Sequence, residues 1–473
     1  MRSKPLASVA VRRALAPLVL AVVCAGSALA SVGLPASGGD PPAAEIAAPV
    51  LSARRAPAFL ARAIADGRLR AELDAALADP RLGAGRDRSC LVVRHGQRPV
   101  LQRRAEGALI PASGMKVLTA LAVLHRLGPD ERLVTEVRAG ALPGPDGVVD
   151  GPLWLVGGGD PLLATADYAA TFPNQPQVRT PLEALADAVV ASGVKVVGGP
   201  VVGDETRYDT QRYIPSWKPG YITDNESGPA SALVVNDGFE RFARPRVAAA
   251  EPDLHAAGVL AALLVARGVV VAGGAAEGQA PPAAVAIARQ ASPPMREVVG
   301  QMLRESDNLT AELLVKELGR RVAGEGTTAA GLGVMRQSLQ EAGLPVDQLA
   351  AVDGSGLDRS DRASCALLVA ALERGGPGGA IAAGLPVAGR DGTLARRFQA
   401  SPAAGRLRAK TGSLDGVAGL TGYVDAPDGG APLAFSLMVN DLPRDALGHQ
   451  LQEQVGAALA RYPDAPAPDA LAP

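Results

Sequence analysis

The sequence lacks an excess of charge of either sign, and it is poor in aromatic residues. Its 473 residues include 47 Lys and Arg against 48 Asp and Glu, which gives a net charge of −1. Because nucleic acids and anionic membranes attract strongly basic surfaces, this balance indicates no nucleic-acid partner. Aromatic residues make up 3% of the chain, yet 48% of its residues are apolar. The apolar share and low net charge together predict a folded protein with a sizeable core.

Cysteine and histidine are too few for a metal-centred or disulfide-rich protein. The chain has three cysteines and four histidines, and it contains no His-Glu-x-x-His pattern. A hydrolytic metal site has no visible ligand set, so we expect neither metal nor cofactor. Besides Cys24, only Cys90 and Cys365 remain, which excludes a disulfide framework. We expect these two to be buried free thiols, with a single bond between them as the alternative.

The N-terminus has the pattern of an export signal. A basic region with four Lys or Arg residues precedes an uncharged run over 14–30, which ends in Ala28-Leu29-Ala30. We interpret residues 1–30 as a secretory signal peptide, with an N-terminal anchor as the alternative, because the run is at the short limit for a membrane span. Both interpretations place the remainder outside the cytoplasmic membrane, in the cell envelope or extracellular. Residues 31–57, rich in Ala, Pro, Gly and Ser, predict a linker.

Strand patterns occur at both ends of the folded part, and helix patterns lie between them. The expected elements are a helix over 58–77, strands at 90–93 and 100–101, helices over 113–127, 295–318 and 328–342, strands over 406–410, 419–424 and 433–439, and a helix over 447–461. This order predicts an α+β fold in which one sheet joins the first and last segments of the chain.

These patterns predict an interrupted domain. We expect the sheet-containing domain to cover residues 58–136 and 286–462. The short strands and helices of 137–285 predict an inserted α+β domain. The Pro- and Ala-rich tail, 463–473, is expected to be disordered.

Two Ser-x-x-Lys pairs occur, and only one is suited to chemistry. Ser113 begins a helix pattern, so Lys116 shares its helical face, and the positive end of the helix dipole favours a nearby anion. The helix is apolar nearly all round, and burial of Lys116 would lower its pKa until it can take the serine proton. Ser192 instead ends a helix before Gly193, and Lys195 falls in the next strand. We therefore predict Ser113, and not Ser192, as a nucleophile.

Two later motifs supply partners for this pair. Ser306-Asp307-Asn308 offers a hydroxyl that can relay protons and an amide that can hold a substrate amide. Lys410-Thr411-Gly412, followed by Ser413, lies on a predicted strand and offers a cation, hydroxyls and a glycine that admits a ligand against the backbone. Each motif alone is most often a helix cap or a strand end. All three in this order form a specific signal.

The three motifs are those of penicillin-binding proteins and class A β-lactamases. The chain resembles one branch, the low-molecular-mass class C penicillin-binding proteins, which are the D-alanyl-D-alanine carboxypeptidase/endopeptidase group of peptidase family S13. Further stretches similar to that family's signatures are Gly158–Pro161, Ser231–Asn236, Asp353–Leu357, Leu385–Gly389 and Asp391–Leu394. The separation of Ser113 and Ser306, 306 − 113 = 193 residues, favours this branch, because β-lactamases have only a small helical block there.

The resemblance implies a fold and an activity. The fold is the serine β-lactamase/DD-peptidase-like transpeptidase fold, an antiparallel sheet flanked by helices. The activity is that of a serine-type D-Ala-D-Ala carboxypeptidase on peptidoglycan stem peptides, with DD-endopeptidase activity as a further option and β-lactam antibiotics as inhibitors. A β-lactamase or esterase of the same fold, or a weakly active penicillin-recognising wall-binding module, is the alternative. The oligomeric state is left open.

The resemblance also assigns roles to residues. Ser113 is acylated, Lys116 takes its proton, and Ser306 returns a proton to the leaving amine. The residues expected to bind substrate are Asn308, Lys410, Thr411, Gly412 and Ser413. Members of the family usually carry a further small β-rich domain after the Ser231–Asn236 region. Few residues separate Asn236 from the next predicted helix, so we infer that this subdomain is reduced or missing.

Overall fold

The computed structural model describes residues 56–471. The signal peptide or anchor predicted for 1–30, and nearly all of the linker predicted for 31–57, lie outside this range. None of the helices in the described range is long and apolar enough to cross a membrane.

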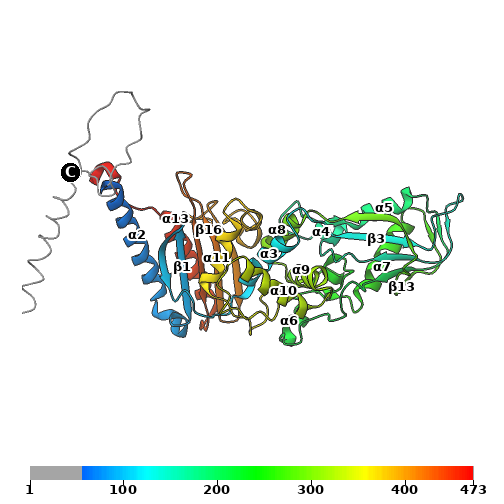
Figure 1. The fold of residues 1–473 in the computed structure, drawn as a ribbon, viewed down its shortest axis with the longest axis horizontal. Helices are drawn as coiled ribbons and strands as arrows, with labels where there is room; N and C mark the ends of the chain where they lie inside the picture. Colours follow the sequence, from blue (N-terminus) through cyan, green and yellow to red (C-terminus); the bar gives the residue numbers. More distant parts are fainter. Residues whose placement is uncertain (1–55, 472–473) are drawn as a thin grey trace, which may run out of the picture. The chain divides into compact units, whose positions relative to one another are not determined.

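A five-stranded antiparallel sheet is assembled from both ends of the chain (Figure 1). Its order is β15–β16–β17–β1–β2, with β1 at Ser89–His95, β2 at Arg98–Arg103, β15 at Leu407–Leu414, β16 at Val417–Val424 and β17 at Leu433–Val439. β1 pairs with β17 from Ser89 opposite Val439 to His95 opposite Leu433. The sheet predicted to join the first and last segments is therefore confirmed.

Both faces of this sheet are covered by helices. Successive side chains along a strand point to opposite faces, and in these strands the side chains on both faces are apolar. On β1, Leu91 and Val93 pack with α2 (Ala56–Leu77) and α13 (Asp445–Arg461). Cys90 and Val92 point the other way, into the second helical layer. That layer contains α3 (Met115–Arg126), α8 (Met295–Glu305), α9 (Asn308–Leu318), α10 (Thr328–Glu341), α11 (Cys365–Gly375) and α12 (Ala380–Gly384).

The helical stretch predicted over 295–318 consists of two helices, α8 and α9. The pattern over 295–318 breaks at Ser306, which has φ 63° and ends α8 in a left-handed conformation. The Asp307 side chain then accepts a hydrogen bond from the Thr310 amide and starts α9. The helical pattern over 295–318 is interrupted here, because an aspartate that caps a new helix offers the backbone a competing local bond.

A second five-stranded sheet, in the order β13–β9–β5–β3–β14, lies with α5 and α7 around its own apolar core (Figure 1). The strands are β3 (Val134–Ala139), β5 (Leu153–Val156), β9 (Val201–Asp204), β13 (Ala275–Glu277) and β14 (Val285–Ala291); the helices are α5 (Leu182–Ala191) and α7 (Pro252–Val265). β3 and β14 reach beyond both ends of the block 137–285, whose domain boundaries stay a prediction.

Short elements complete this half of the structure. They are β4 (Val148–Val149), β6 (Leu163–Ala164), α4 (Ala166–Ala169), β7 (Thr180–Pro181), β8 (Val196–Val197), α6 (Pro219–Thr223), β10 (Phe239–Arg241), β11 (Val247–Ala248) and β12 (Val270–Val271). Only the β10–β11 hairpin lies between Asn236 and α7, so this described interval holds no further β-rich domain.

The C-terminal tail departs from its prediction as far as the structure describes it. Residues 463–471 were expected to be disordered, but Asp464 lies 3.2 Å from the Arg68 guanidinium and Ala465 packs against the core beneath α2. The anchor is Tyr462, which is buried and donates a hydrogen bond from its hydroxyl to Asp66. A short 3₁₀ turn at Pro468–Leu471 follows.

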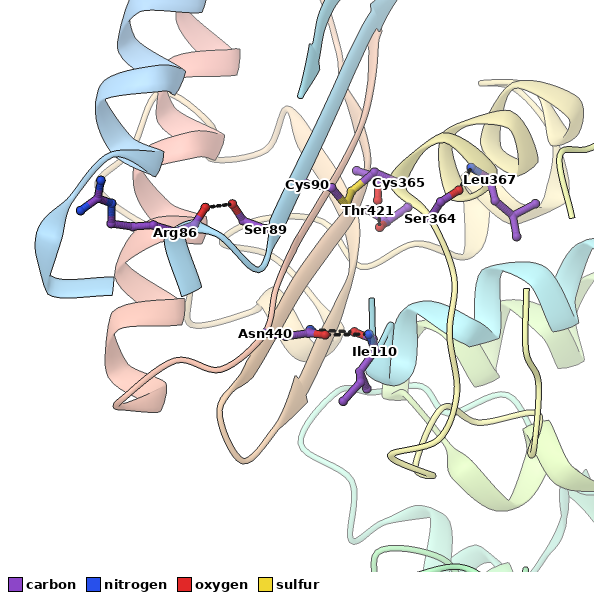
Figure 2. The surroundings of a disulfide bond; sticks show 10 residues. Arg86, Ser89, Cys90, Ile110, Ser364, Cys365, Leu367, Thr421 and Asn440 are labelled. Atoms are coloured by element: carbon purple, nitrogen blue, oxygen red, sulfur yellow. Dashed lines mark hydrogen bonds between the residues drawn. A yellow bond between two sulfur atoms is a disulfide. The ribbon is translucent and has the colours of Figure 1, made fainter. Parts of the chain in front are cut away.

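A disulfide joins Cys90 of β1 to Cys365, the first residue of α11 (Figure 2). The expectation of two free thiols was therefore wrong. Cys90 faces the helical layer in which α11 lies, and both residues are fully buried. A sequence separation of 275 residues conceals this contact, because nothing local to either cysteine points to the other.

We predict that replacing both Cys90 and Cys365 by Ala lowers the free energy of unfolding by about 2–4 kcal/mol, since the bond restricts a long loop in the unfolded chain. Denaturant unfolding of the variant and of the oxidised protein measures the difference. Alkylation of Cys90 and Cys365 in denatured, unreduced protein would contradict the bond.

Candidate active site

The Ser113 and Lys116 side chains are in contact, as the sequence predicts. Ser113 lies in the 3₁₀ turn Ala112–Gly114 that leads into α3, and the Lys116 amine donates a hydrogen bond to Ser113 Oγ at 3.1 Å. Lys116 is fully buried. Burial lowers its pKa to about 8, although the nearby carboxylates of Asp353 and Glu312 act in the opposite direction. A large fraction of this lysine is therefore neutral at mildly alkaline pH.

The turn that presents Ser113 is held in an unfavourable backbone conformation. Ala112 has φ 46°, in the left-handed region that residues with a Cβ rarely adopt. Gly356 lies directly against it: a Cβ at Gly356 would be 1.8 Å from the Ala112 carbonyl oxygen. The close approach of the 353–356 turn therefore requires glycine and supports the backbone that carries Ser113.

Two buried carboxylates, Glu312 and Asp353, stand behind Lys116. Sequence analysis singled out Asp353 as part of the stretch Asp353–Leu357, but it did not identify Glu312. Glu312 accepts hydrogen bonds from the amides of Gly354 and Ser355 at 3.1 and 2.8 Å, and burial together with Asp353 raises its pKa. Asp353 accepts from the indole of Trp217 at 2.8 Å. A signal for Glu312 existed, because it lies four residues after Asn308 and so shares its face of α9.

The hydrogen bonds to Glu312 hold the 353–356 turn in place beside Lys116. The Ser355 carbonyl oxygen accepts a hydrogen bond from the Lys116 amine at 2.8 Å. The Ser355 hydroxyl accepts one from the Leu357 amide at 3.3 Å and is fully buried. Ser355 thus orients Lys116 through its backbone.

A second serine–lysine contact lies across the site. The Lys410 amine donates to Ser306 Oγ at 2.8 Å and to the Thr411 carbonyl at 2.9 Å. Lys410 is fully buried, and burial, followed by the charge of Lys116, holds its pKa well below the usual lysine value. The left-handed backbone of Ser306 turns its side chain toward β15, where Lys410 lies.

Asn308 connects Lys116 of the first serine–lysine pair to the backbone of Glu226. Its Oδ1 accepts from the Lys116 amine at 2.6 Å, and its Nδ2 donates to the Glu226 carbonyl at 2.7 Å. A carbonyl of this chain therefore occupies the position that the sequence assigns to a substrate amide.

β15 presents a partly open edge to the site. Its neighbour β16 covers one side, and on the other the Ala409 amide donates to Pro386 and the Leu407 carbonyl accepts from Ala388. Because backbone groups alternate along a strand, the amides of Thr411 and Ser413 face this same outer edge. In the described structure, the segment that contains Pro386 and Ala388 pairs with β15 only as far as Ala409, so the edge beyond Ala409 is open.

These residues surround a cavity of about 680 Å³. Its lining includes Ser113, Ser306, Asn308, Thr411 and Ser413, with Lys116 and Lys410 buried behind it. The cavity is also lined by four of the chain's few aromatic residues, Tyr168, Phe172, Tyr221 and Phe239. Sequence analysis gave no signal for these aromatic residues in the site.

Ser192 lies outside this cavity, as the sequence predicts. It caps the C-terminus of α5 and donates from its hydroxyl to the Val189 carbonyl at 2.7 Å. Lys195 is exposed and precedes β8. Among the described residues, the carboxylates of Glu251, Asp253 and Glu277 lie close enough together to hold a metal ion. None of the three lines the cavity.

Two serine–lysine pairs beside an open strand edge, on an antiparallel sheet covered by helices, define the serine β-lactamase/DD-peptidase class of fold. The model of the D-Ala-D-Ala carboxypeptidase 3 (S13) family matches residues 69–243 and 241–462. The chain therefore belongs to this family of serine peptidases. The two matched segments meet within the β10–β11 hairpin.

Individual relatives agree with this assignment. The D-alanyl-D-alanine carboxypeptidase of Actinomadura sp. (strain R39) is 32% identical, over 85% of this chain and 86% of that protein. Carboxypeptidase DacB of Mycolicibacterium smegmatis is 31% identical, over 78% of this chain and 79% of that protein. The crystal structure of penicillin-binding protein 4 from Haemophilus influenzae shares the fold, with a TM-score of 0.66 at 19% identity, over 78% of this chain and 95% of that one.

We predict that Gly412→Ala damages the site. The new Cβ would lie 2.7 Å from the Pro111 carbonyl oxygen and push β15 away from the Ser113 turn. Overpacking of this kind costs about 1–3 kcal/mol. The temperature of thermal unfolding and the rate of penicillin acylation should both fall. The control is Gly140→Ala, whose new Cβ meets no atom within 4 Å, and it should change neither quantity. An unaffected acylation rate in Gly412→Ala would contradict the close approach.

Proposed function

We propose that the chain is a D-Ala-D-Ala carboxypeptidase that acts on peptidoglycan stem peptides through an acyl-enzyme on Ser113. The observation that carries this proposal is the hydrogen bond of 3.1 Å between Ser113 Oγ and a fully buried lysine amine. Membership of the S13 family supports the substrate class.

The first half-reaction forms the ester. Neutral Lys116 removes the Ser113 proton, and Oγ attacks the carbonyl carbon between the two terminal D-alanines. The amides of Ser113 and Ser413 stabilise the oxyanion. The carbon–nitrogen bond then breaks, and Ser306, assisted by Lys410, gives a proton to the leaving D-alanine amine. Water subsequently cleaves the ester and regenerates Ser113.

Substrate is held along the open edge of β15. We propose that the Thr411 and Ser413 hydroxyls and the Lys410 amine bind its terminal carboxylate, while Gly412 allows the peptide to approach the strand. Asn308 holds the substrate amide, so a bound peptide replaces the Glu226 carbonyl at Nδ2. β-Lactams follow the same path and leave an ester that hydrolyses slowly.

The proposed substrate requires a location outside the cytoplasmic membrane. The predicted export signal within residues 1–30 supports such a location, in the cell envelope or extracellular.

We predict that a fluorescent penicillin labels the wild-type protein and that Ser113→Ala abolishes the label, because no oxygen remains to form the ester. Ser192→Ala, which removes the serine of the other Ser-x-x-Lys pair, should be labelled like wild type. Labelling is read from denaturing gels after matched incubation times, with thermal unfolding to verify that each variant is folded. Label that survives Ser113→Ala would refute the mechanism.

We predict that acylation by penicillin accelerates with pH. Below a pKa of about 8 Lys116 is mostly protonated, and its neutral fraction rises about tenfold per pH unit. The second-order acylation rate should therefore rise with pH and level off above about 8. Stopped-flow measurements between pH 6 and 9.5 give the profile, and a rate that is flat over this range would exclude Lys116 as the base.

A further inference from the structure

The stretch Asp391–Leu394 resembles a family signature, but the proposed reaction gives it no role. The segment before it runs along the outer edge of β15, where Val387 forms an isolated bridge with Arg408. The Asp391 carboxylate accepts from the Val387 amide at 2.7 Å and closes the turn. This turn therefore lies where the covered part of the β15 edge gives way to the open part.

Gly392 lets the turn pack against the end of α8. Its φ is 52°, and a Cβ there would lie 2.4 Å from the carbonyl oxygen of Arg304, in the last turn of α8. Only glycine satisfies both conditions. The turn is thus wedged between the helix that ends at Ser306 and the strand that carries Lys410 and Thr411.

Thr393, the next residue, reaches the Lys-Thr-Gly motif. Its Oγ1 accepts a hydrogen bond from Thr411 Oγ1 at 3.1 Å. Thr411 lines the cavity, whereas Thr393 does not, so Thr393 contacts the Thr411 hydroxyl from behind. Because both groups are hydroxyls, this hydrogen bond can reverse, with Thr393 as the donor, when an anion draws the Thr411 proton into the cavity.

The charge of the ligand decides which hydroxyl donates. A hydroxyl has one proton, and if Thr411 gave its proton to Thr393 it would present only lone pairs to a carboxylate in the cavity. If Thr393 donates instead, the proton of Thr411 is free to point into the cavity. Hydrogen bonds in such a chain also strengthen one another.

We propose that Thr393 is a positioning residue: when a carboxylate binds, the hydrogen bond reverses, Thr393 donates to Thr411, and the Thr411 proton is directed toward the terminal carboxylate of the substrate. This role rests on the proposed function, since it requires an anionic ligand beside Thr411. It extends the carboxylate site by a residue 18 positions before the Lys-Thr-Gly threonine.

The test replaces Thr393 by Val, which keeps the shape and removes the hydroxyl, and by Ser, which keeps the hydroxyl. A hydrogen bond of ordinary strength corresponds to about a fivefold change in an equilibrium or rate constant. For Thr393→Val we expect about a fivefold lower second-order acylation rate with a penicillin that carries its free carboxylate. We expect no comparable loss with the methyl ester of the same penicillin, and Thr393→Ser should restore the wild-type ratio of the two rates.

A double-mutant cycle with Thr411→Val isolates the pair. Once Thr411 lacks its hydroxyl, Thr393→Val should cause no further loss toward the free carboxylate. Equal losses for acid and ester would show a merely structural role and overturn the proposal, as would no loss at all or an additive cycle. Failure of the proposed function is a separate result, namely wild-type protein that no penicillin acylates.

Discussion

The site depends on a lysine amine that is removed from water while it remains hydrogen-bonded. Burial disfavours the charged form of Lys116, and the contacts to Ser113, Asn308 and Ser355 hold the amine in one position. Without burial the amine would be a protonated surface lysine, unable to accept the serine proton. The nearby carboxylates of Asp353 and Glu312 act in the opposite direction, but burial outweighs them and lowers the pKa of Lys116 to about 8.

The fold is organised to supply these contacts from distant parts of the sequence. The 3₁₀ turn before α3 carries Ser113, and α3 itself carries Lys116. α9 carries Asn308 and Glu312, and the 353–356 turn closes the third side. β15 then brings Lys410 and Thr411 to the opposite wall, and its own edge is exposed because β16 pairs with only one side. The close approach of backbone at Gly356 and Gly412 explains why glycine occurs at both positions.

Sequence analysis identifies the groups whose function requires a local pattern. The helical spacing of Ser113 and Lys116 and the strand that carries Lys410 leave periodic signals, as do the strands that join the first and last segments. Groups that act through tertiary contact leave none: Cys90 and Cys365 are far apart in the chain, and Glu226 reaches Asn308 only in the folded protein. The exact break at Ser306 depends on a single side chain, because Asp307 caps the start of α9.

The two buried lysines are not equivalent, and their difference matches the proposed division of labour. Lys116 has carboxylates behind it that favour its charged form, whereas Lys410 is influenced chiefly by burial and by the positive charge of Lys116. A carboxylate that binds beside Lys410 would therefore raise the pKa of this lysine, because the negative charge stabilises the protonated amine. Binding of the terminal carboxylate would charge the amine that contacts Ser306, so substrate recognition would itself load the proton that the leaving amine needs.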